Sequence, residues 1–416
     1  MTAPAATLSA VEQDADILVS GAGIAGMIAA AGLAHAGWRV VLVDPAPPPK
    51  DAEADGSDLR ATAYLHPSVE LFQRLGLWND LAPHATPLAA LEVIDTQGWP
   101  PEAQAARIFT AHDLGLPVFG WNLPNWLTRR RLGDLLADLP GLDLRFGTGV
   151  AGLFTRTTGA RVDLSDGSRL GVRLIVGADG RASTVRAAHG IGTQVRRYGQ
   201  KALAFAAVHD RPHADVSVEI YNVGGAFTTV PLPDHDGRPA SAIVWMNDGP
   251  RAQALMEMAG APFGDAMTTR AMGRLGRMDL ASPRRIWPVV TQTAARLTAE
   301  RTALIAEAAH VLPPIGAQGL NTSLADVAAL LSALDGATDP GAPAVLDRYA
   351  RARARDVALR ARAIDLFNRV CKSDAGPAHA LRRAGLAAVH DIAALRQAVM
   401  HAGMGAAFSG GGMGRG

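Results

Sequence analysis

The fold of this chain is decided by residues 15–44, which read ADILVSGAGIAGMIAAAGLAHAGWRVVLVD. Residues 15–20 form a short apolar run typical of a buried strand, and residues 24–36 are small residues that favour a helix packed closely on a sheet. Residues 39–44 form a second apolar run, which ends in Asp44. The order strand, helix, strand predicts a β-α-β unit.

The turn between the first strand and the helix carries the pattern G-x-G-x-x-G, as Gly21-Ala22-Gly23-Ile24-Ala25-Gly26. In this pattern the first glycine permits a tight turn, the second lets a pyrophosphate approach the backbone, and the third lets the helix pack on the strand. The N–H groups at the helix N-terminus then face the phosphates. Asp44 follows at the spacing expected of an acid that binds a ribose hydroxyl. A glycine-rich turn without a ligand is the alternative, but the combination predicts a dinucleotide site, for FAD or for NAD.

Three further segments bear on which dinucleotide binds. They read DLRATA at residues 58–63, LIVGADG at residues 174–180 and AAHVLPPIGAQGLN at residues 308–321. At these residues the chain resembles the flavoprotein aromatic hydroxylases, typified by para-hydroxybenzoate hydroxylase, and among them the ubiquinone-biosynthesis hydroxylases most. The resemblance extends from Asp16 to Met404. It implies that FAD is the bound cofactor and that NADH or NADPH is a transient reductant, in agreement with the lack of a second G-x-G-x-x-G.

The resemblance also implies a role for each segment. It places the residues of the first segment beside the flavin, Arg129 on the FAD phosphates, the residues of the second segment at the pyrophosphate, and those of the third along the isoalloxazine ring. The residues concerned are Arg60, Ala61, Thr62, Arg129, Ala178, Asp179, Gly180, Pro314, Gly316, Gly319, Leu320 and Asn321.

The third segment supports a ring-binding role on physical grounds as well. Gly316 and Gly319 leave the backbone bare, so a flat ring can lie against it. Because Gly319 precedes a predicted helix, the N–H groups of Leu320 and Asn321 would face negative charge on a reduced flavin. A proline- and glycine-rich loop that only caps the helix is the alternative.

The chain departs from the family pattern at Ala306-Glu307. The resemblance implies Gly-Asp here, with the aspartate bonded to a hydroxyl of the FAD ribityl chain. Glu307 can accept the same bond from one methylene further out, while Ala306 adds a methyl group where the backbone meets the cofactor. We expect both to contact FAD, and we keep a flavin-weakened accessory protein as an alternative.

The remaining chain predicts an α/β fold in which a Rossmann-like FAD-binding β-α-β domain is interleaved with an antiparallel-sheet substrate domain and followed by C-terminal helices. Short β-rich runs after residue 198 indicate that sheet, with one open face, and residues 252–277 are expected to be helical. We assign the FAD-binding domain to residues 15–87, 125–196 and 291–340, the substrate domain to 88–124 and 197–290, and the helices to 341–402. Residues 1–14 and 403–416 are expected to be a disordered arm and a glycine-rich tail.

Composition limits the function classes. The chain has 416 residues and a formal net charge of +1, which argues against nucleic-acid binding by bulk charge. Cys371 is the only cysteine, so disulfides within the chain and cysteine-based zinc clusters are excluded, and a reducing, cytoplasmic setting fits. No apolar run is long enough for a membrane span. We expect no metal, and no group of residues stands out as a catalytic constellation, as suits an enzyme whose cofactor carries the chemistry.

We therefore expect an FAD-dependent monooxygenase that hydroxylates a phenolic ring with NAD(P)H and O2. The resemblance implies a polyprenylated ubiquinone precursor, and hence a peripheral contact with the inner membrane or with a quinone-synthesis complex. A hydroxylase of a soluble aromatic metabolite is the alternative. His310 is expected to be structural and bonded to a backbone carbonyl, and Tyr198-Gly199-Gln200 to open the sheet or to shape it under the substrate.

Overall fold

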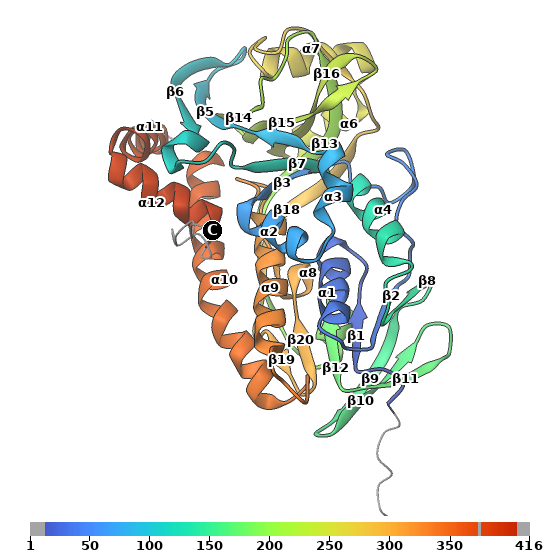
Figure 1. Ribbon diagram of the computed structural model, residues 1–416. Helices are drawn as coiled ribbons and strands as arrows, with labels where there is room; N and C mark the ends of the chain where they lie inside the picture. Colours follow the sequence, from blue (N-terminus) through green and yellow to red (C-terminus); the bar gives the residue numbers. More distant parts are fainter. Residues whose placement is uncertain (1–12, 373–375, 406–416) are drawn as a thin grey trace, which may run out of the picture.

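The computed structural model describes residues 13–372 and 376–405. Figure 1 shows two stacked lobes, with the N-terminal β-α-β unit in the lower one and a large sheet in the upper one. The C-terminal helices run along one side of both lobes. The chain passes repeatedly from one lobe to the other, as the sequence predicts.

The lower lobe is built on a six-stranded sheet. Its strands β20, β12, β1, β2 and β8 are parallel to their neighbours, and only the edge strand β19 is antiparallel. The inner strands are buried except for Asp44 at the end of β2, since helices cover one face and a small sheet covers the other. In sheet order the strands are β19 (Thr298–Ala299), β20 (Thr302–Leu304), β12 (Leu174–Gly177), β1 (Ile17–Ser20), β2 (Val40–Asp44) and β8 (Leu142–Phe146).

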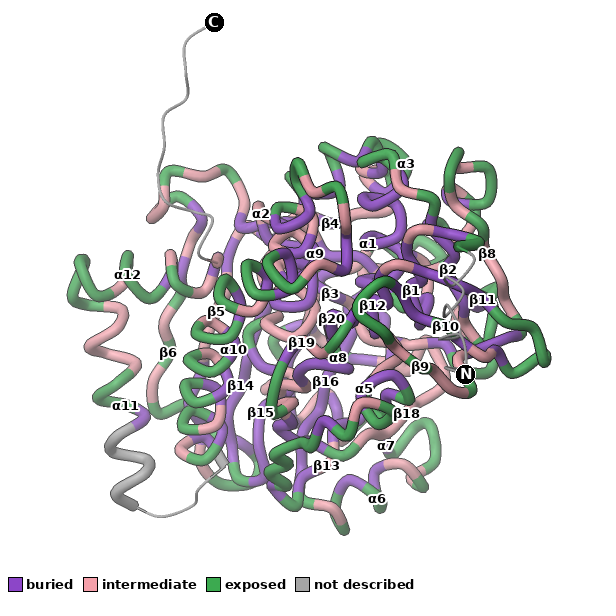
Figure 2. The backbone as a smooth tube through the Cα atoms, turned by 90° about the horizontal axis from the view of Figure 1, so that it is seen from below, coloured by how far each residue is buried: buried purple, intermediate pink, exposed green. Residues whose placement is uncertain are grey.

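Helix α1 (Ile24–His35) lies on this sheet between α4 (Asn125–Leu136) and α9 (Gln318–Leu334). Because α1 consists of small and aliphatic residues, it packs closely, and nearly all of it is buried. An antiparallel sheet of β9 (Val150–Arg156), β10 (Gly159–Leu164) and β11 (Arg169–Val172) contributes to the same core, beside α5 (Thr184–Ala188). Figure 2 shows the strands β1 and β12 as buried and much of β9 to β11 at the periphery.

The upper lobe is built on a nine-stranded sheet. The sequence predicts an antiparallel sheet, but β14 and β5 pair in parallel, because β5 comes from a distant part of the chain and enters beside β14 in the same direction. In order the strands are β21 (His310–Val311), β18 (Arg285–Ala294), β13 (Thr193–His209), β16 (Arg238–Asp248), β15 (Gly225–His235), β14 (Val216–Asn222), β5 (Ala90–Gln97) and β6 (Glu102–Thr110), and β17 (Met278–Leu280) also pairs with β13.

The outer face of this sheet is covered by helices. Helices α6 (Gly249–Glu257) and α7 (Gly260–Arg270) pack on the outer face over a core that includes Phe205, Phe227 and Trp245. The prediction of one helix over residues 252–277 is wrong in two respects. First, the helix is interrupted at Met258, whose backbone is extended, and a second helix begins at Gly260. Second, this helix ends at Arg270, before Gly273 and Gly276, which have positive φ.

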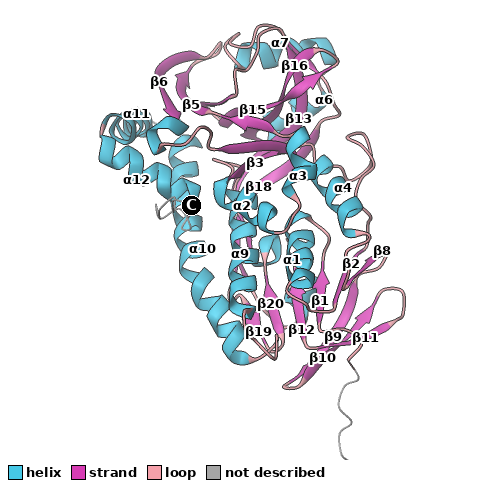
Figure 3. Cartoon of the chain, viewed as in Figure 1, coloured by secondary structure: helices cyan, strands magenta, loops and turns pink. Residues whose placement is uncertain are grey.

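Several short elements lie between the lobes (Figure 3). They are a small antiparallel sheet, the short helices that connect its strands, and one short helix from later in the chain. They comprise β3 (Ala61–Leu65), β4 (Thr86–Leu88), β7 (Gly120–Pro124), α2 (His66–Arg74), α3 (Trp78–Leu81), the 3₁₀ turns Ala82–His84 and Ala111–Leu114, and α8 (Ala306–Ala309).

The chain closes with α10 (Pro343–Lys372), α11 (Gly376–Asp391) and α12 (Ala393–Met404). Helix α11 is held to the upper sheet by a buried ion pair of 2.7 Å between Arg382 Nε and Asp95 Oδ1. The predicted tail begins later than expected, because Gly403 and Met404 still belong to α12, and the rest of it lies outside the described residues, as does most of the predicted N-terminal arm.

Candidate active site

The three glycines of the first motif have distinct surroundings. A Cβ atom on Gly21 would lie 2.4 Å from the carbonyl oxygen of Ala178, and one on Gly26 would lie 1.9 Å from that of Gly21, so neither position has room for a side chain. Gly21 also has a φ of +107°. A Cβ atom on Gly23, in contrast, would meet no atom within 4 Å. The first and third glycines are therefore required by the fold, while the second faces open space at the N-terminus of α1.

A cavity of about 500 Å³ lies at this end of α1. Asp44 lines it, and its carboxylate accepts hydrogen bonds from the N–H groups of Ala22 (2.6 Å) and Ala46 (2.8 Å). Arg129 lines it as well, 3.6 Å from Asp44, and donates to the carbonyl oxygen of Ala22 (2.8 Å). The cavity thus has an acidic and a basic group at one end, both fixed by bonds to the glycine-rich turn.

Asp179 also lines this cavity, between Ala178 and Gly180. Its Oδ2 accepts the N–H of Val185 at 3.0 Å, whereas its buried Oδ1 has no hydrogen-bond partner among the described residues. Buried polar atoms are usually paired. An unpaired carboxylate oxygen on a cavity wall indicates a hydrogen-bonding ligand there.

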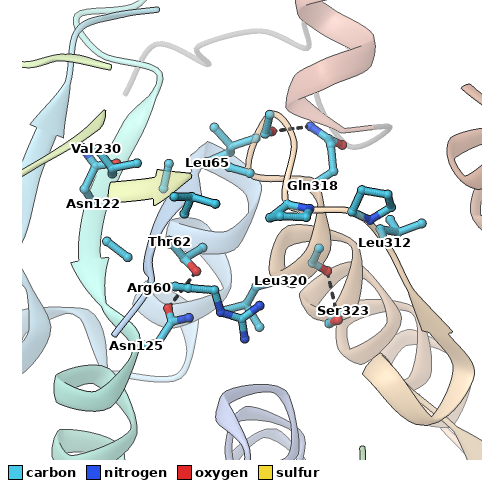
Figure 4. A pocket seen from close by; sticks show the side chains of 18 of the residues that line it. Arg60, Thr62, Leu65, Asn122, Asn125, Val230, Leu312, Gln318, Leu320 and Ser323 are labelled. Carbon is cyan, nitrogen blue, oxygen red and sulfur yellow. Dashed lines mark hydrogen bonds between the residues drawn. The ribbon is translucent and has the colours of Figure 1, made fainter. Parts of the chain in front are cut away.

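A second cavity of about 560 Å³ extends from this region to the upper sheet. The two cavities share wall residues that include Gly23, Ile24, Ala178 and Gly180, so together they form one path between the lobes. Each volume is in the range of small-molecule sites, roughly 300–1,000 Å³. The second cavity is lined mainly by apolar side chains, and Figure 4 shows Arg60, Thr62 and Asn125 on one side of it and Leu312, Leu320 and Ser323 on the other.

Arg60 is fixed at the junction of the cavities by Asp58. Its guanidinium donates two hydrogen bonds to the Asp58 carboxylate (2.8 and 2.7 Å) and lies over the Trp287 ring, 5.3 Å from its centre. The Asp58 charge raises the pKa of Arg60, and Arg60 holds the pKa of Asp58 below its usual value against the effect of burial. Asn125 donates to Asp58 and accepts from Thr62, which holds the residues of the first segment in place.

The third segment forms a loop that enters α9 through Ala317, which has a φ of +55°. Pro314, Gly316, Gly319 and Leu320 all line the second cavity. Asn321 does not, because its side chain is fully occupied by the protein: it accepts from the Leu65 N–H and the Ser68 hydroxyl, and it donates to the carbonyl oxygens of Ala63 and Ala317.

Most of the predicted site residues therefore lie on one continuous wall. The exceptions are Asn321 and Ala22, and Ala22 is fully buried, so only its backbone serves the turn. The residues on the walls are Gly21, Gly23, Ile24, Ala25, Gly26, Asp44, Arg60, Ala61, Thr62, Arg129, Ala178, Asp179, Gly180, Ala306, Glu307, Pro314, Gly316, Gly319 and Leu320.

The pair Ala306-Glu307 also lines the second cavity. Ala306 has a φ of +55°, a left-handed conformation that glycine adopts more easily than alanine. Glu307 is exposed, and it forms no hydrogen bond or ion pair with another described residue. Its carboxylate is therefore free to accept a hydrogen bond from a ligand.

Behind this pair lies a buried charge network that the sequence does not reveal. Asp326, in the middle of α9, accepts hydrogen bonds from His310 Nε2 (2.6 Å), Arg353 Nε (2.8 Å) and the N–H of Ala306 (3.0 Å). Burial alone would raise the pKa of Asp326, but His310 and Arg353 together hold it below its usual value. His310 is thus bonded to a carboxylate and not to a backbone carbonyl as expected.

The segment Tyr198-Gly199-Gln200 lies within β13 and not at the start of a strand. The Tyr198 hydroxyl lies 2.7 Å from that of Thr291 and donates to Asp365 of α10 at 2.8 Å. The segment lines neither cavity. It therefore joins the upper sheet to the C-terminal helices and does not shape the cavity directly.

Comparison with known proteins agrees with this geometry. A family model described as an FAD binding domain matches residues 14–363. The chain belongs to the FAD-binding domain family. Ubiquinone hydroxylase UbiL of Rhodospirillum rubrum is 32% identical over 395 residues, which cover 94% of this chain and 90% of that one. The 3-demethoxyubiquinol 3-hydroxylase of Escherichia coli is 28% identical, with coverage of 94% and 98%.

Solved structures show the same fold. The p-nitrophenol 4-monooxygenase of Pseudomonas putida DLL-E4 matches with a TM-score of 0.74 at 20% identity, over 95% of this chain and 99% of that one. This member of the FAD-binding domain family is an FAD-dependent monooxygenase, and FAD is its cofactor. The open space at Gly23 fits the pyrophosphate of a dinucleotide, and the unpaired Asp179 oxygen can accept a hydrogen bond from one of its hydroxyl groups.

Two further observations concern metal sites and membrane spans in the described residues. In the described part of the chain, no group of histidine, cysteine and acidic residues is arranged to hold a metal ion. None of the described helices is long and apolar enough to cross a membrane.

Proposed function

We propose that this monooxygenase hydroxylates a phenolic ring that carries a long apolar chain, such as a polyprenylated precursor of ubiquinone. NADH or NADPH would supply the electrons and O2 the oxygen. In the balanced reaction the phenol, O2, NAD(P)H and a proton give the diphenol, water and NAD(P)+. The likeness to ubiquinone hydroxylases supports the substrate class.

The cofactor would be held along the continuous wall. The N-terminus of α1 and Arg129 would take the pyrophosphate, Asp44 the ribose and Glu307 the ribityl chain. The loop before α9 and the first turn of α9, from Pro314 to Leu320, would line the ring. When bound, FAD supplies the electron transfer and the activation of oxygen. The protein's own residues must hold the ring of the substrate beside it and exclude water.

The shape of the second cavity is the observation that carries the substrate proposal. Its walls include Leu91, Phe109 and Phe119 near the upper sheet, and Val389, Val399 and Met400 from α11 and α12. Val399 both lines the cavity and is 44% exposed, so the apolar wall reaches the surface at α12. Ile392 and Leu395 are also exposed nearby in the chain. A phenol in the cavity could therefore pass an apolar tail out between these helices.

The experiment that tests this function begins with the purified protein and added FAD. We expect a flavin spectrum with one FAD per chain, followed by oxidation of NADH or NADPH that depends on a phenol with a geranyl chain ortho to its hydroxyl. Mass spectrometry should find one added oxygen in the product. If unsubstituted phenol is turned over equally well, the substrate is a soluble aromatic compound. A protein that stays colourless with excess FAD would point to an accessory role and to Ala306-Glu307 as the cause.

We also propose that α10 contacts an anionic membrane surface. Arg355, Leu359, Arg362, Leu366 and Arg369 recur every three or four residues and are exposed, so they form one face of the helix. Arg355 and Arg362 have no ion-pair partner among the described residues. Basic and apolar residues on one helix face favour binding to anionic lipid.

Co-sedimentation with lipid vesicles tests this contact. Binding to vesicles with anionic lipid should exceed binding to neutral ones and should fall in the double variant Leu359→Ser, Leu366→Ser. Val223→Ser is the matched control, because Val223 is 52% exposed but lies in the turn between β14 and β15. Equal binding by all three proteins would contradict the proposal.

A further inference from the structure

One acidic side chain in the second cavity has no place in binding the cofactor. Glu219 lies in the middle of β14, where alternate residues face opposite sides of the sheet. Val218 and Ile220 point into the core under α7, while Ser217 and Glu219 line the cavity. Glu219 is only 7% exposed, although its neighbours across the sheet are Val93 and Thr228.

The Glu219 carboxylate is held in place by two hydrogen bonds. Its Oε2 accepts the Tyr221 hydroxyl at 2.6 Å, and its Oε1 accepts the N–H of Gly316 at 3.3 Å. Gly316 belongs to the loop that lines the ring-binding part of the cavity. Since an ionised carboxylate has about four lone-pair positions, it can accept a further proton donor from the cavity.

No positive charge compensates Glu219 within the described residues. The nearby titratable groups are Tyr221 on the same strand and Cys371 on α10, while Asp95 and Arg382 pair with each other. Burial raises the pKa of Glu219 above its usual value, against the hydrogen bonds from Tyr221 and Gly316. A buried carboxylate without a cation is costly for the fold, and such groups gather at functional sites.

We propose that Glu219 is the catalytic base that takes the phenolic proton, which rests on the proposed function. The O–H bond of the phenol breaks, its electron pair stays on the phenolic oxygen, and the proton bonds to a carboxylate oxygen of Glu219. Negative charge thus moves from the carboxylate to the ring oxygen, and the ring carbons ortho and para to it become more nucleophilic. One oxygen atom of O2 then bonds to one of these carbons, whose hydrogen leaves as a proton. The O–O bond breaks, and the other oxygen atom leaves as water with the two electrons that NAD(P)H supplies.

The test compares Glu219→Gln with the wild-type holoenzyme on the geranyl-substituted phenol. The amide keeps the shape: its oxygen can still accept the N–H of Gly316, and its NH2 group can donate to the Tyr221 hydroxyl oxygen, so the variant should bind FAD with wild-type stoichiometry. Its kcat should fall about a hundred-fold or more, as is common for the loss of a general base. Glu300→Gln is the matched control, because Glu300 is exposed and bonded to Thr155 far from the cavity, and it should have wild-type kcat.

Two readouts separate a base from a structural role. The defect of Glu219→Gln should shrink on fluorinated, more acidic phenols, which ionise without help. The wild-type kcat should also fall at low pH, where Glu219 is protonated. The kcat of Glu219→Gln should not show this fall. In Tyr221→Phe the fall in kcat should occur at a higher pH, because the carboxylate loses a hydrogen bond that favours its charged form.

The outcomes are distinguishable. An active wild type with an equally active Glu219→Gln, or a defect that is the same for all phenols, would overturn the role of Glu219 and leave the proposed function intact. A flavin-loaded wild type that hydroxylates none of the phenols would overturn the proposed function, and the role of Glu219 with it.

Discussion

The network around Asp326 makes a quantitative prediction for the variant Asp326→Asn. Asp326 is fully buried and accepts three hydrogen bonds, from His310, Arg353 and the N–H of Ala306. The amide has no charge, and its NH2 group would face groups that are themselves donors. Breaking a buried ion pair by removing one partner costs about 3–5 kcal/mol. Because Arg353 keeps a second partner in Asp356 at 2.7 Å, we expect the free energy of unfolding to fall by about 3 kcal/mol, the lower end of this range.

Equilibrium unfolding in urea, followed by circular dichroism, measures this loss. The control is Asp335→Asn, because Asp335 is exposed at the end of the same helix and should change the free energy of unfolding by no more than about 0.5 kcal/mol. The difference in free energy of unfolding between wild type and Asp326→Asn should be largest above pH 3.8, the ordinary pKa of the carboxyl. It should shrink as the pH falls through the lower pKa that Asp326 has in the folded protein. A loss under 1 kcal/mol at neutral pH would refute the reasoning.

Three further predictions concern the cofactor wall and the C-terminal helices. Gly23→Ala should fold normally but bind FAD at least about ten-fold more weakly. Gly26→Ala should lose both stability and FAD binding, because its methyl group would lie 1.9 Å from a carbonyl oxygen. FAD titration and thermal melting distinguish the two variants, and equal behaviour would contradict the roles assigned to the two glycines. Ala306→Gly should raise the free energy of unfolding by about 1 kcal/mol, because the left-handed backbone no longer carries a Cβ atom, and urea unfolding that shows a loss would speak against this. Arg382→Ala should leave Asp95 buried without its partner and release α11 from the upper sheet. Limited proteolysis should therefore cut the C-terminal helices faster than in the control Arg107→Ala, which removes an exposed ion pair with Asp391. Equal rates of cleavage would argue against the buried pair as the anchor.

The sequence predicts the lower lobe well because its signals are local. The turn at Gly21 to Gly26, the apolar strands beside it and Asp44 all lie within one short segment, and the structure has them as predicted. The end of the third segment is likewise readable from its glycines: Gly316 lies in the loop before α9, and Gly319 lies in the first turn of α9. Local glycine and apolar patterns therefore locate both ends of the continuous wall along the two cavities.

The parts that were not predicted depend on contacts between distant residues. Nothing in β5 or β14 reveals that they pair in parallel, since the two strands are far apart in the sequence. Asp326 looks like an ordinary polar residue of a helix, and only the fold brings His310 and Arg353 to it. Glu219 is equally inconspicuous, although the alternation of Val218, Glu219 and Ile220 could have shown that an acid faces away from an apolar core.

The repeated passage of the chain between the lobes has an evolutionary consequence. Strand β18 of the upper sheet pairs with β21, which follows β20 of the lower lobe after only the short helix α8. Strands β5 and β6 come from a segment between parts of the lower lobe. The upper lobe is therefore not a contiguous module, and recombination cannot exchange it in one piece. New substrates must be acquired through point substitutions on the strands and loops that face the cavity, one side chain at a time, while the cofactor wall stays intact.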